Sequence, residues 1–159
     1  VSMMEMVDLL DSKDIVLIKD ETSFEWREIC RKIYPVAVRA VEENLIDVID
    51  LLAKVGFVDV GDDDDHGNSL LHIASLSGKE EILDHILKGF RVDVNRPNLH
   101  PKQHRAIHFA ASRGNIKCIS LLLDYWAFID VMDSQGQTAL FKAAEGGHFD
   151  AVNLLAQRG

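Results

Sequence analysis

A ten-residue segment recurs four times along this chain at almost constant spacing. Its copies begin at Pro35, Ser69, Arg105 and Thr138, and the first of them is the weakest match. Each copy ends at a glycine-type position, and these positions are Asn44, Gly78, Gly114 and Gly147. The steps between them are 34, 36 and 33 residues by subtraction. Self-similarity at this period indicates a solenoid, in which one structural unit stacks on the next.

Each unit continues in the same way after its glycine-type position. An apolar stretch follows, at residues 45–53, 82–87, 116–123 and 149–156. Next come a chain-reversal signal and a short β-prone segment, and the β-prone segments are 58–60, 92–95 and 128–131. A polar turn such as 133–137 leads into the next copy. The unit therefore predicts a turn, a helix, a glycine turn, a second helix and an extended finger.

This layout resembles the ankyrin repeat, whose pattern is Asp-x-x-Gly-x-Thr-Pro-Leu-His-x-Ala-Ala, then Gly, then Leu-Leu and Gly-Ala-Asp-Val-Asn. The last copy matches it at Asp133, Gly136, Thr138, Leu140, Ala143, Ala144, Gly147, Leu154, Leu155 and Gly159. The two preceding copies match at Asp64, Gly67, Leu71, His72, Ala74 and Gly78, and at Ile107, His108, Ala110, Ala111, Gly114, Leu121 and Leu122. The resemblance implies an all-α fold, an α-solenoid of helix-turn-helix repeats with short β-hairpin fingers.

The resemblance covers residues 35–159, with repeats expected at 35–67, 68–103, 104–136 and 137–159. Residues 1–34 fit the pattern poorly. We predict that they form an atypical N-terminal capping element, or a partial repeat with an inserted helix that starts at a capping box of Thr22 and Glu25. At the other end, Gly159 stands where the pattern continues with Ala-Asp-Val-Asn, so we expect the array to be part of a longer protein.

Composition argues against several classes of partner. The formal net charge of −9 disfavours nucleic acid and anionic membrane surfaces, because both are bound through lysine and arginine. No apolar run approaches the roughly 20 residues that span a membrane. The two cysteines, Cys30 and Cys118, form no CxxC pair and are expected to be reduced thiols of an intracellular protein, cytoplasmic or nuclear. No cofactor is expected, and the oligomeric state stays open.

Two clusters could suggest a metal site, and neither has suitable spacing. His100, His104 and His108 are four residues apart, but Pro97 and Pro101 interrupt any helix that would align them. The acidic run 62–65 lacks the alternating ligands and the distant glutamate of a calcium loop. The chain also carries no Walker loop, GxSxG or HExxH motif, so we predict that it is not an enzyme.

The resemblance implies a non-catalytic module that binds a protein or peptide, within a larger scaffold or signalling protein. Such ligands contact the finger tips and the exposed ends of the first helices. In this sequence those positions are Asp65, His66, Asn68, Leu76, Ser77, Pro101, Lys102, His104, Ser112, Arg113, Ser134, Gln135, Gln137 and Glu145. The alternative is a regulatory ankyrin segment that binds within an enzyme or an ion channel. The resemblance also implies that His72 and His108 bond the turns to their neighbours, a role that Phe141 cannot fill in the last copy.

Two aromatic residues stand where the family pattern has small or polar ones. Trp126 replaces the glycine and Phe128 the aspartate of Gly-Ala-Asp-Val-Asn. They are either packing residues or an exposed anchor for a partner. Asn95 ends the finger motif of the second copy, where the resemblance implies a structural asparagine or, as the alternative, a target for an oxygen-dependent hydroxylase.

Overall fold

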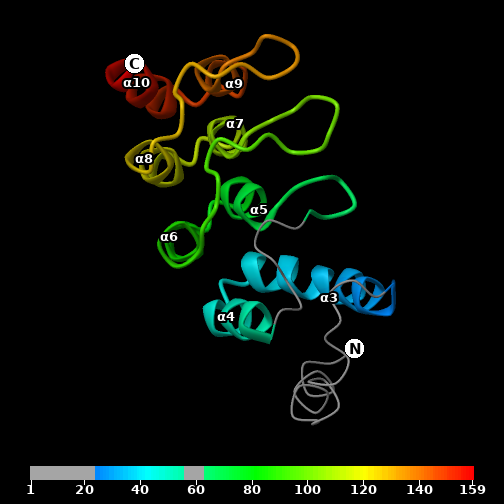
Figure 1. Ribbon diagram of the computed structural model, residues 1–159. Coiled ribbons are helices and arrows are strands. Elements are labelled where there is room, and N and C mark those ends of the chain that lie inside the picture. The colour runs from blue at the N-terminus through cyan, green and yellow to red at the C-terminus, as the bar shows by residue number, and fades with distance from the viewer. Residues whose placement is uncertain (1–23, 56–62) are drawn as a thin grey trace.

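The computed structural model describes residues 24–55 and 63–159, and in these ranges the chain forms eight helices stacked in pairs (Figure 1). They are α3 (Phe24–Glu42), α4 (Ile46–Val55), α5 (Leu70–Ser77), α6 (Glu80–Gly89), α7 (Ala106–Ser112), α8 (Ile116–Asp124), α9 (Ala139–Glu145) and α10 (Phe149–Arg158). The first helices α3, α5, α7 and α9 pack one on the next, and the second helices form a parallel layer beside them. The predicted all-α repeat fold is confirmed.

Left-handed residues end the first helices, as the sequence predicts. The backbone φ angle is 61° at Asn44, 67° at Gly78, 66° at Gly114 and 71° at Gly147. Glycine has no Cβ to oppose this conformation, and asparagine tolerates it better than most residues. These turns reverse the chain so that each second helix returns along its partner.

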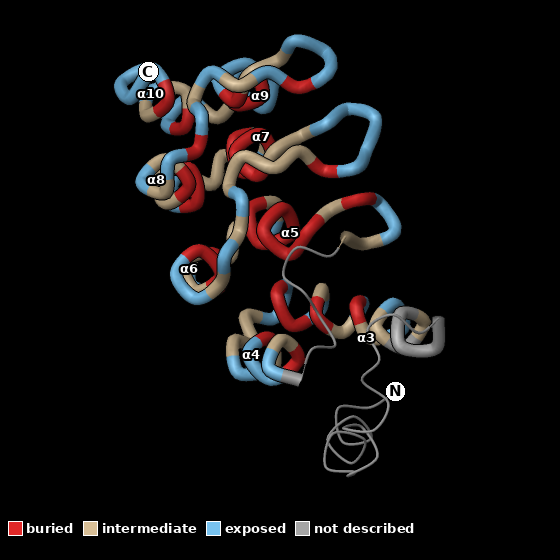
Figure 2. Tube along the Cα trace, viewed as in Figure 1, coloured by how far each residue is buried: buried red, intermediate tan, exposed pale blue. Residues whose placement is uncertain are grey.

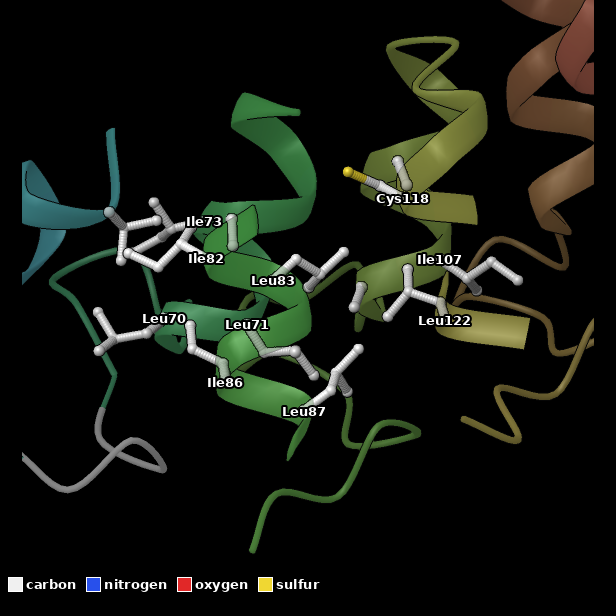
Figure 3. Packing of buried hydrophobic residues seen from close by; sticks show 14 of the residues in the cluster. Leu70, Leu71, Ile73, Ile82, Leu83, Ile86, Leu87, Ile107, Cys118 and Leu122 are labelled. Atoms are coloured by element: carbon white, nitrogen blue, oxygen red, sulfur yellow. The ribbon is translucent and has the colours of Figure 1, made fainter. Parts of the chain in front are cut away.

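The core runs continuously through the stack (Figure 2). Ala74, Ala110 and Ala143 are 0% exposed, and their short side chains let successive first helices approach closely. Figure 3 shows the larger apolar residues that fill the space between the two layers. In α5 to α8 these include Leu70, Ile82, Leu83, Ile86, Ile107, Ile119 and Leu122.

The N-terminal part of the array is one long helix. α3 continues through Pro35, so the expected boundary between residues 34 and 35 falls inside it. Its first half extends beneath the finger that precedes α5 (Figure 1), where Arg31 lies 3.8 Å from Asp65 and the Tyr34 hydroxyl donates to the Asn68 carbonyl. The helix thus occupies the place that a finger takes in the later units. The expected capping residue Thr22 and the possible partial repeat lie outside the described residues.

The short β-hairpins expected in the fingers are not confirmed. Within 24–55 and 63–159 no strand forms, and the pairing of Asp63 with Ser69 is an isolated bridge. The fingers are closed instead by backbone hydrogen bonds across their bases, from Asp64 to Asn68 (2.9 Å), from Asn98 to His104 (2.7 Å) and from Asp133 to Gln137 (2.9 Å). None of the described helices has the length and apolar character needed to cross a membrane.

We predict that Gly114→Val destabilises the fold by about 2 kcal/mol or more, because valine is strained at positive φ and its Cβ meets another side chain. A Cβ at Gly114 would lie 2.6 Å from the His148 ring, which is bonded to the Ser112 carbonyl. Gly147→Val is the matched control, since its φ is similar and a Cβ there meets nothing within 4 Å. Urea unfolding should give a smaller loss for Gly147→Val. Equal losses would contradict the steric role of His148.

Candidate interaction surface

Two buried histidines hold the fingers in place. The Nδ1 atoms of His72 and His108 accept hydrogen bonds from the backbone N–H groups of Ser69 (3.1 Å) and Arg105 (3.0 Å). Nε2 is therefore the protonated nitrogen in each ring. His72 Nε2 donates to the Arg96 carbonyl at 3.1 Å, and His108 Nε2 lies 3.0 and 3.2 Å from the Val131 and Gln137 carbonyls. The predicted structural role of both histidines is confirmed.

These histidines are neutral in the folded chain. Burial lowers the pKa of His72 to about 4, although its bond to the Arg96 carbonyl acts in the opposite direction. Burial also lowers the pKa of His108, partly offset by the Val131 carbonyl. A second ring proton would point at the backbone N–H that now donates to Nδ1. Protonation therefore opposes the contacts that position the fingers.

Successive fingers are bonded to each other through their backbones. The N–H of Leu99 donates to the Gly67 carbonyl at 2.8 Å, and the N–H of Ser134 donates to the Lys102 carbonyl at 2.9 Å. Between the first two fingers, the Asn98 side chain also donates to the Asn68 side chain at 2.8 Å. The three finger tips project on the same side of the stack (Figure 1). They form one row of fixed backbone alongside the first helices.

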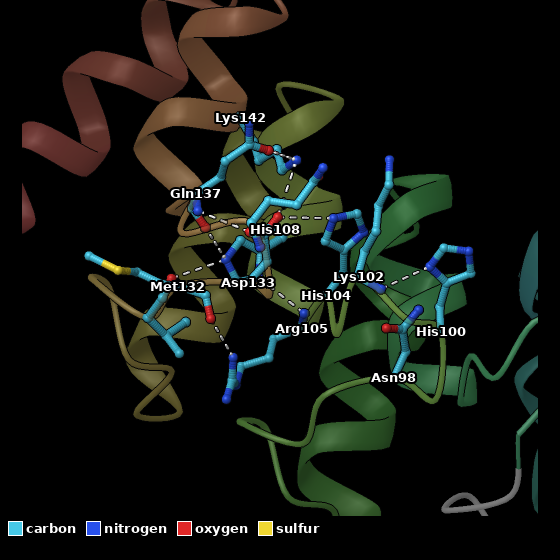
Figure 4. A network of polar contacts seen from close by, with 12 residues as sticks. Asn98, His100, Lys102, His104, Arg105, His108, Met132, Asp133, Gln137 and Lys142 are labelled. Atoms are coloured by element: carbon cyan, nitrogen blue, oxygen red, sulfur yellow. Dashed lines mark hydrogen bonds and ion pairs between the residues drawn. The ribbon is translucent and has the colours of Figure 1, made fainter.

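The last finger encloses a buried carboxylate (Figure 4). The Asp133 side chain is 0% exposed, and it accepts from the N–H groups of Gln135 (2.8 Å) and Gln137 (2.9 Å). Lys142 Nζ lies 3.3 Å and His104 Nε2 3.2 Å from its second oxygen. Burial acts to raise the pKa of Asp133, but the two backbone donors and Lys142 outweigh it and the pKa is lowered. The pKa of His104 is lowered by burial and by the Lys142 charge.

Lys142 was not among the residues predicted for the site. It stands four residues after Thr138, a position held by Ile73 after Ser69 and by Phe109 after Arg105. A cation at a position that is apolar in the two preceding copies is the available signal. Its side chain is 10% exposed and also donates to Gln137 Oε1, so it secures the finger from beneath.

Most of the predicted contact residues lie on the surface. The exposed ones are Asp65, His66, Ser77, Pro101, Lys102, Arg113, Ser134, Gln135 and Glu145. The half-buried ones are Asn68, Leu76, His104, Ser112 and Gln137. Three of the half-buried side chains face inward. Asn68 accepts from Asn98, Gln137 accepts from Lys142, and His104 Nε2 lies 3.2 Å from the Asp133 carboxylate. These three side chains therefore stabilise the fingers and are less available to a partner than the exposed residues.

The residues weighed as metal ligands take separate places. His100 is exposed at a finger tip, His104 lies against Asp133, and His108 is buried. In the acidic run, Asp62 lies outside the described residues and Asp65 is exposed. Asp64 accepts from the N–H groups of His66 and Asn68 within the turn, and Asp63 pairs with Arg96 at 2.6 Å. The run is therefore less solvated than its sequence suggests, because two of its carboxylates build the finger.

The two aromatic residues lie on the outside of the loop after α8. Trp126 is 84% exposed and Phe128 is 63% exposed. The Asn95 side chain binds this loop, donating to the Trp126 carbonyl at 3.0 Å and accepting from the Phe128 N–H at 2.8 Å. Asn95 thus joins two successive repeats. A groove of about 340 Å³ runs beside the aromatic residues and is also lined by Leu123, Ala127, Ile129 and Arg158.

We predict that acid weakens the fold as His72 is forced to protonate. Its folded pKa lies below the usual 6.5, so the unfolded chain binds more protons between pH 6.5 and about 4. Stability is complete above this window and falls as the pH decreases through it, by an amount on the order of 3 kcal/mol from His72. Urea unfolding at pH 7, 5.5 and 4.5 should show a smaller pH dependence for His72→Gln. Parallel profiles for the two proteins would contradict this assignment.

Comparison with known proteins identifies the repeats. The sequence model of the family described as Ankyrin repeats (3 copies) matches residues 71–159. The chain is 37% identical over 127 residues to the E3 ubiquitin-protein ligase hecd-1 of Caenorhabditis elegans. The aligned region is 72% of this chain and 5% of that protein. It is 34% identical over 86 residues to human protein phosphatase 1 regulatory subunit 27, covering 48% of this chain and 56% of that protein.

A third relative is the human transient receptor potential cation channel subfamily A member 1, 35% identical over 103 residues, which are 63% of this chain and 9% of the channel. The chain thus spans a small fraction of the ligase and the channel. The family model covers the repeats in which histidines and left-handed glycines position the fingers, and this chain belongs to the ankyrin repeat family.

Proposed function

We propose that the array is a non-catalytic module that binds a partner protein or peptide through its finger tips and the exposed ends of its first helices. The observation that carries the proposal is the continuous row of finger tips. Backbone hydrogen bonds from Leu99 to Gly67 and from Ser134 to Lys102 connect the three fingers. Exposed polar side chains therefore stand on a shared, fixed backbone. Ankyrin repeats are in general protein-interaction modules, which is consistent with this use of the surface.

The rigidity of the row favours binding. Association loses free energy when loops and side chains must become ordered at the interface, and a surface that is already held loses less. His72 and His108 fix the finger backbones from inside, and Lys142 fixes the last finger through Asp133. A partner would then contact side chains such as Lys102 and Arg113 without having to order the loops that carry them.

The net charge of −9 supports a protein partner over nucleic acid. We place the array in a larger scaffold or signalling protein inside the cell, since relatives such as hecd-1 contain the matched region as a small segment. The same observation supports a second candidate function. The array could bind within its own protein and regulate an enzyme or channel domain. The channel relative supports this candidate, because the region matched by this chain is 9% of a much larger protein.

We predict that reversing two charges on this surface, Lys102→Glu with Arg113→Glu, abolishes partner capture and leaves the fold intact. Both side chains are exposed, so the stability change should stay within about 0.5 kcal/mol. Affinity capture from cell extract with mass spectrometry would compare the proteins retained by the wild type and the variant.

The matched control is Lys54→Glu with Arg91→Glu, which reverses two exposed charges away from the finger row. Partners of the proposed surface should be retained by this control. Capture that survives the first pair and is lost with the control would reject the finger surface. If a further domain of the same protein competes with the captured partner, the regulatory function is the better description.

A further inference from the structure

The backbone at Trp126 is in a conformation that suits glycine. Its φ angle is 67°, and it follows α8 with its N–H donating to the Leu123 carbonyl (3.0 Å) while the Ala127 N–H donates to the Leu122 carbonyl (2.9 Å). This is the residue after a helix end where glycine is usual, and a bulky residue there is strained. The indole is 84% exposed, so burial offsets little of that strain. The stability of the fold does not explain a tryptophan at this position.

The preceding repeat provides an internal comparison. Asp133 begins the last finger, and Asn98 begins the preceding finger in the same way. Counted back from these two residues, Trp126 corresponds to Arg91, seven residues before the finger. Phe128 corresponds to Asp93, five residues before it. Arg91 and Asp93 are exposed, although the next repeat packs against their loop through Asn95. These two positions therefore face outward even when a further repeat follows. The unusual feature of the last loop is that aromatic residues occupy them.

The loop is also held firmly. Asn95 binds it at both the Trp126 carbonyl and the Phe128 N–H, and Ala127 between them is buried. The two aromatic side chains are thus presented on fixed backbone. Exposed, rigidly held aromatic residues are the side chains that dominate binding energy at protein interfaces.

The surroundings are apolar, and one exposed carboxylate follows the groove residue Ile129 in the sequence. The groove of about 340 Å³ brings Leu123, Ala127 and Ile129 beside the aromatic residues, and its one cation, Arg158, already pairs with Asp124 at 2.5 Å. Asp130 is exposed two residues after Phe128, and its carboxylate has no ion pair within the part of the chain that the structure describes. The chain as a whole carries a net charge of −9. A partner with positive charge matches this surface.

We propose that Trp126, Phe128 and the adjoining groove bind a basic, apolar peptide segment of a partner protein. An aliphatic side chain of the segment enters the groove beside the two aromatic rings. A lysine or arginine next to it pairs with Asp130 and lies over the exposed indole, since cations are attracted to the face of tryptophan. This site is separate from the finger row and does not depend on the function proposed for that row.

The test uses the 159-residue chain and two fluorescein-labelled hexapeptides, one of alternating arginine and leucine and one of alternating glutamate and leucine. Fluorescence anisotropy should show binding of the basic peptide and none of the acidic one. Trp126→Gly should weaken binding about tenfold or more, because it removes the anchor. Its melting temperature should be unchanged or higher, because glycine relieves the strain at positive φ.

The ionic contact is tested by Asp130→Asn, which introduces the residue found at the corresponding position in the preceding repeat, Asn95. Binding should weaken about threefold. Asp150→Asn, which removes one exposed charge on α10, is the matched control and should bind as the wild type does. The pair Lys102→Glu with Arg113→Glu should also keep full affinity, so a failure of the finger row is distinguishable from a failure of this site.

Several outcomes would overturn the proposal. Full affinity in Trp126→Gly, or no binding of the basic peptide to the wild type, would remove the site. A lower melting temperature in Trp126→Gly would make Trp126 a packing residue. Equal losses in Asp130→Asn and Asp150→Asn would indicate general charge attraction. Self-association of the wild type that is abolished by Trp126→Gly would assign the surface to a second copy of the chain.

Discussion

The close approach of successive first helices is the constraint on which the rest of this structure depends. A single helix pair has no interior of its own, so its apolar side chains are buried only by the neighbouring pair. Ala74, Ala110 and Ala143 are fully buried where the first helices meet, and larger side chains would separate the helices. The same spacing brings His72 and His108 within reach of the neighbouring finger carbonyls. The position of the candidate interaction surface therefore follows from the packing of the core.

The fold was predictable because its signals are local and repeated. The left-handed positions and the bonding histidines follow from residue types that recur at one place in several units, glycine at Gly78, Gly114 and Gly147 and histidine at His72 and His108. The continuity of α3 could not be inferred in this way. Pro35 marks the start of a weak copy and is usually unfavourable inside a helix, and there was no repeated pattern before it to compare. The fingers also gave a β-like sequence signal, but they are too short to form more than an isolated bridge.

The candidate surface was predictable in outline and less so in detail. Residues assigned by their place in the repeat, such as Lys102 and Arg113, are indeed exposed. The contacts of Lys142 with Asp133 and of Arg96 with Asp63 join residues 9 and 33 positions apart by subtraction, and each joins two neighbouring repeats at one place in the array. A pattern shared by all copies carries no information about such pairs. They decide which polar side chains support the fingers and which remain available to a partner.

Exposure of an apolar residue has different meanings at different positions of a repeat. Phe141 is 48% exposed. It corresponds to His108 of the preceding copy, since each stands three residues after the first residue of its copy. His108 is buried by the unit that follows it. Exposure of Phe141 therefore describes a stacking face. Trp126 differs because its counterpart Arg91 stays exposed with a following unit in place. The backbone of Trp126 is strained by its positive φ angle, and the side chain stays exposed when repeats stack. Neither core packing nor local conformation therefore favours an aromatic residue there. That combination, more than hydrophobicity, is the reason to propose an interaction site at Trp126 and a stacking surface at Phe141.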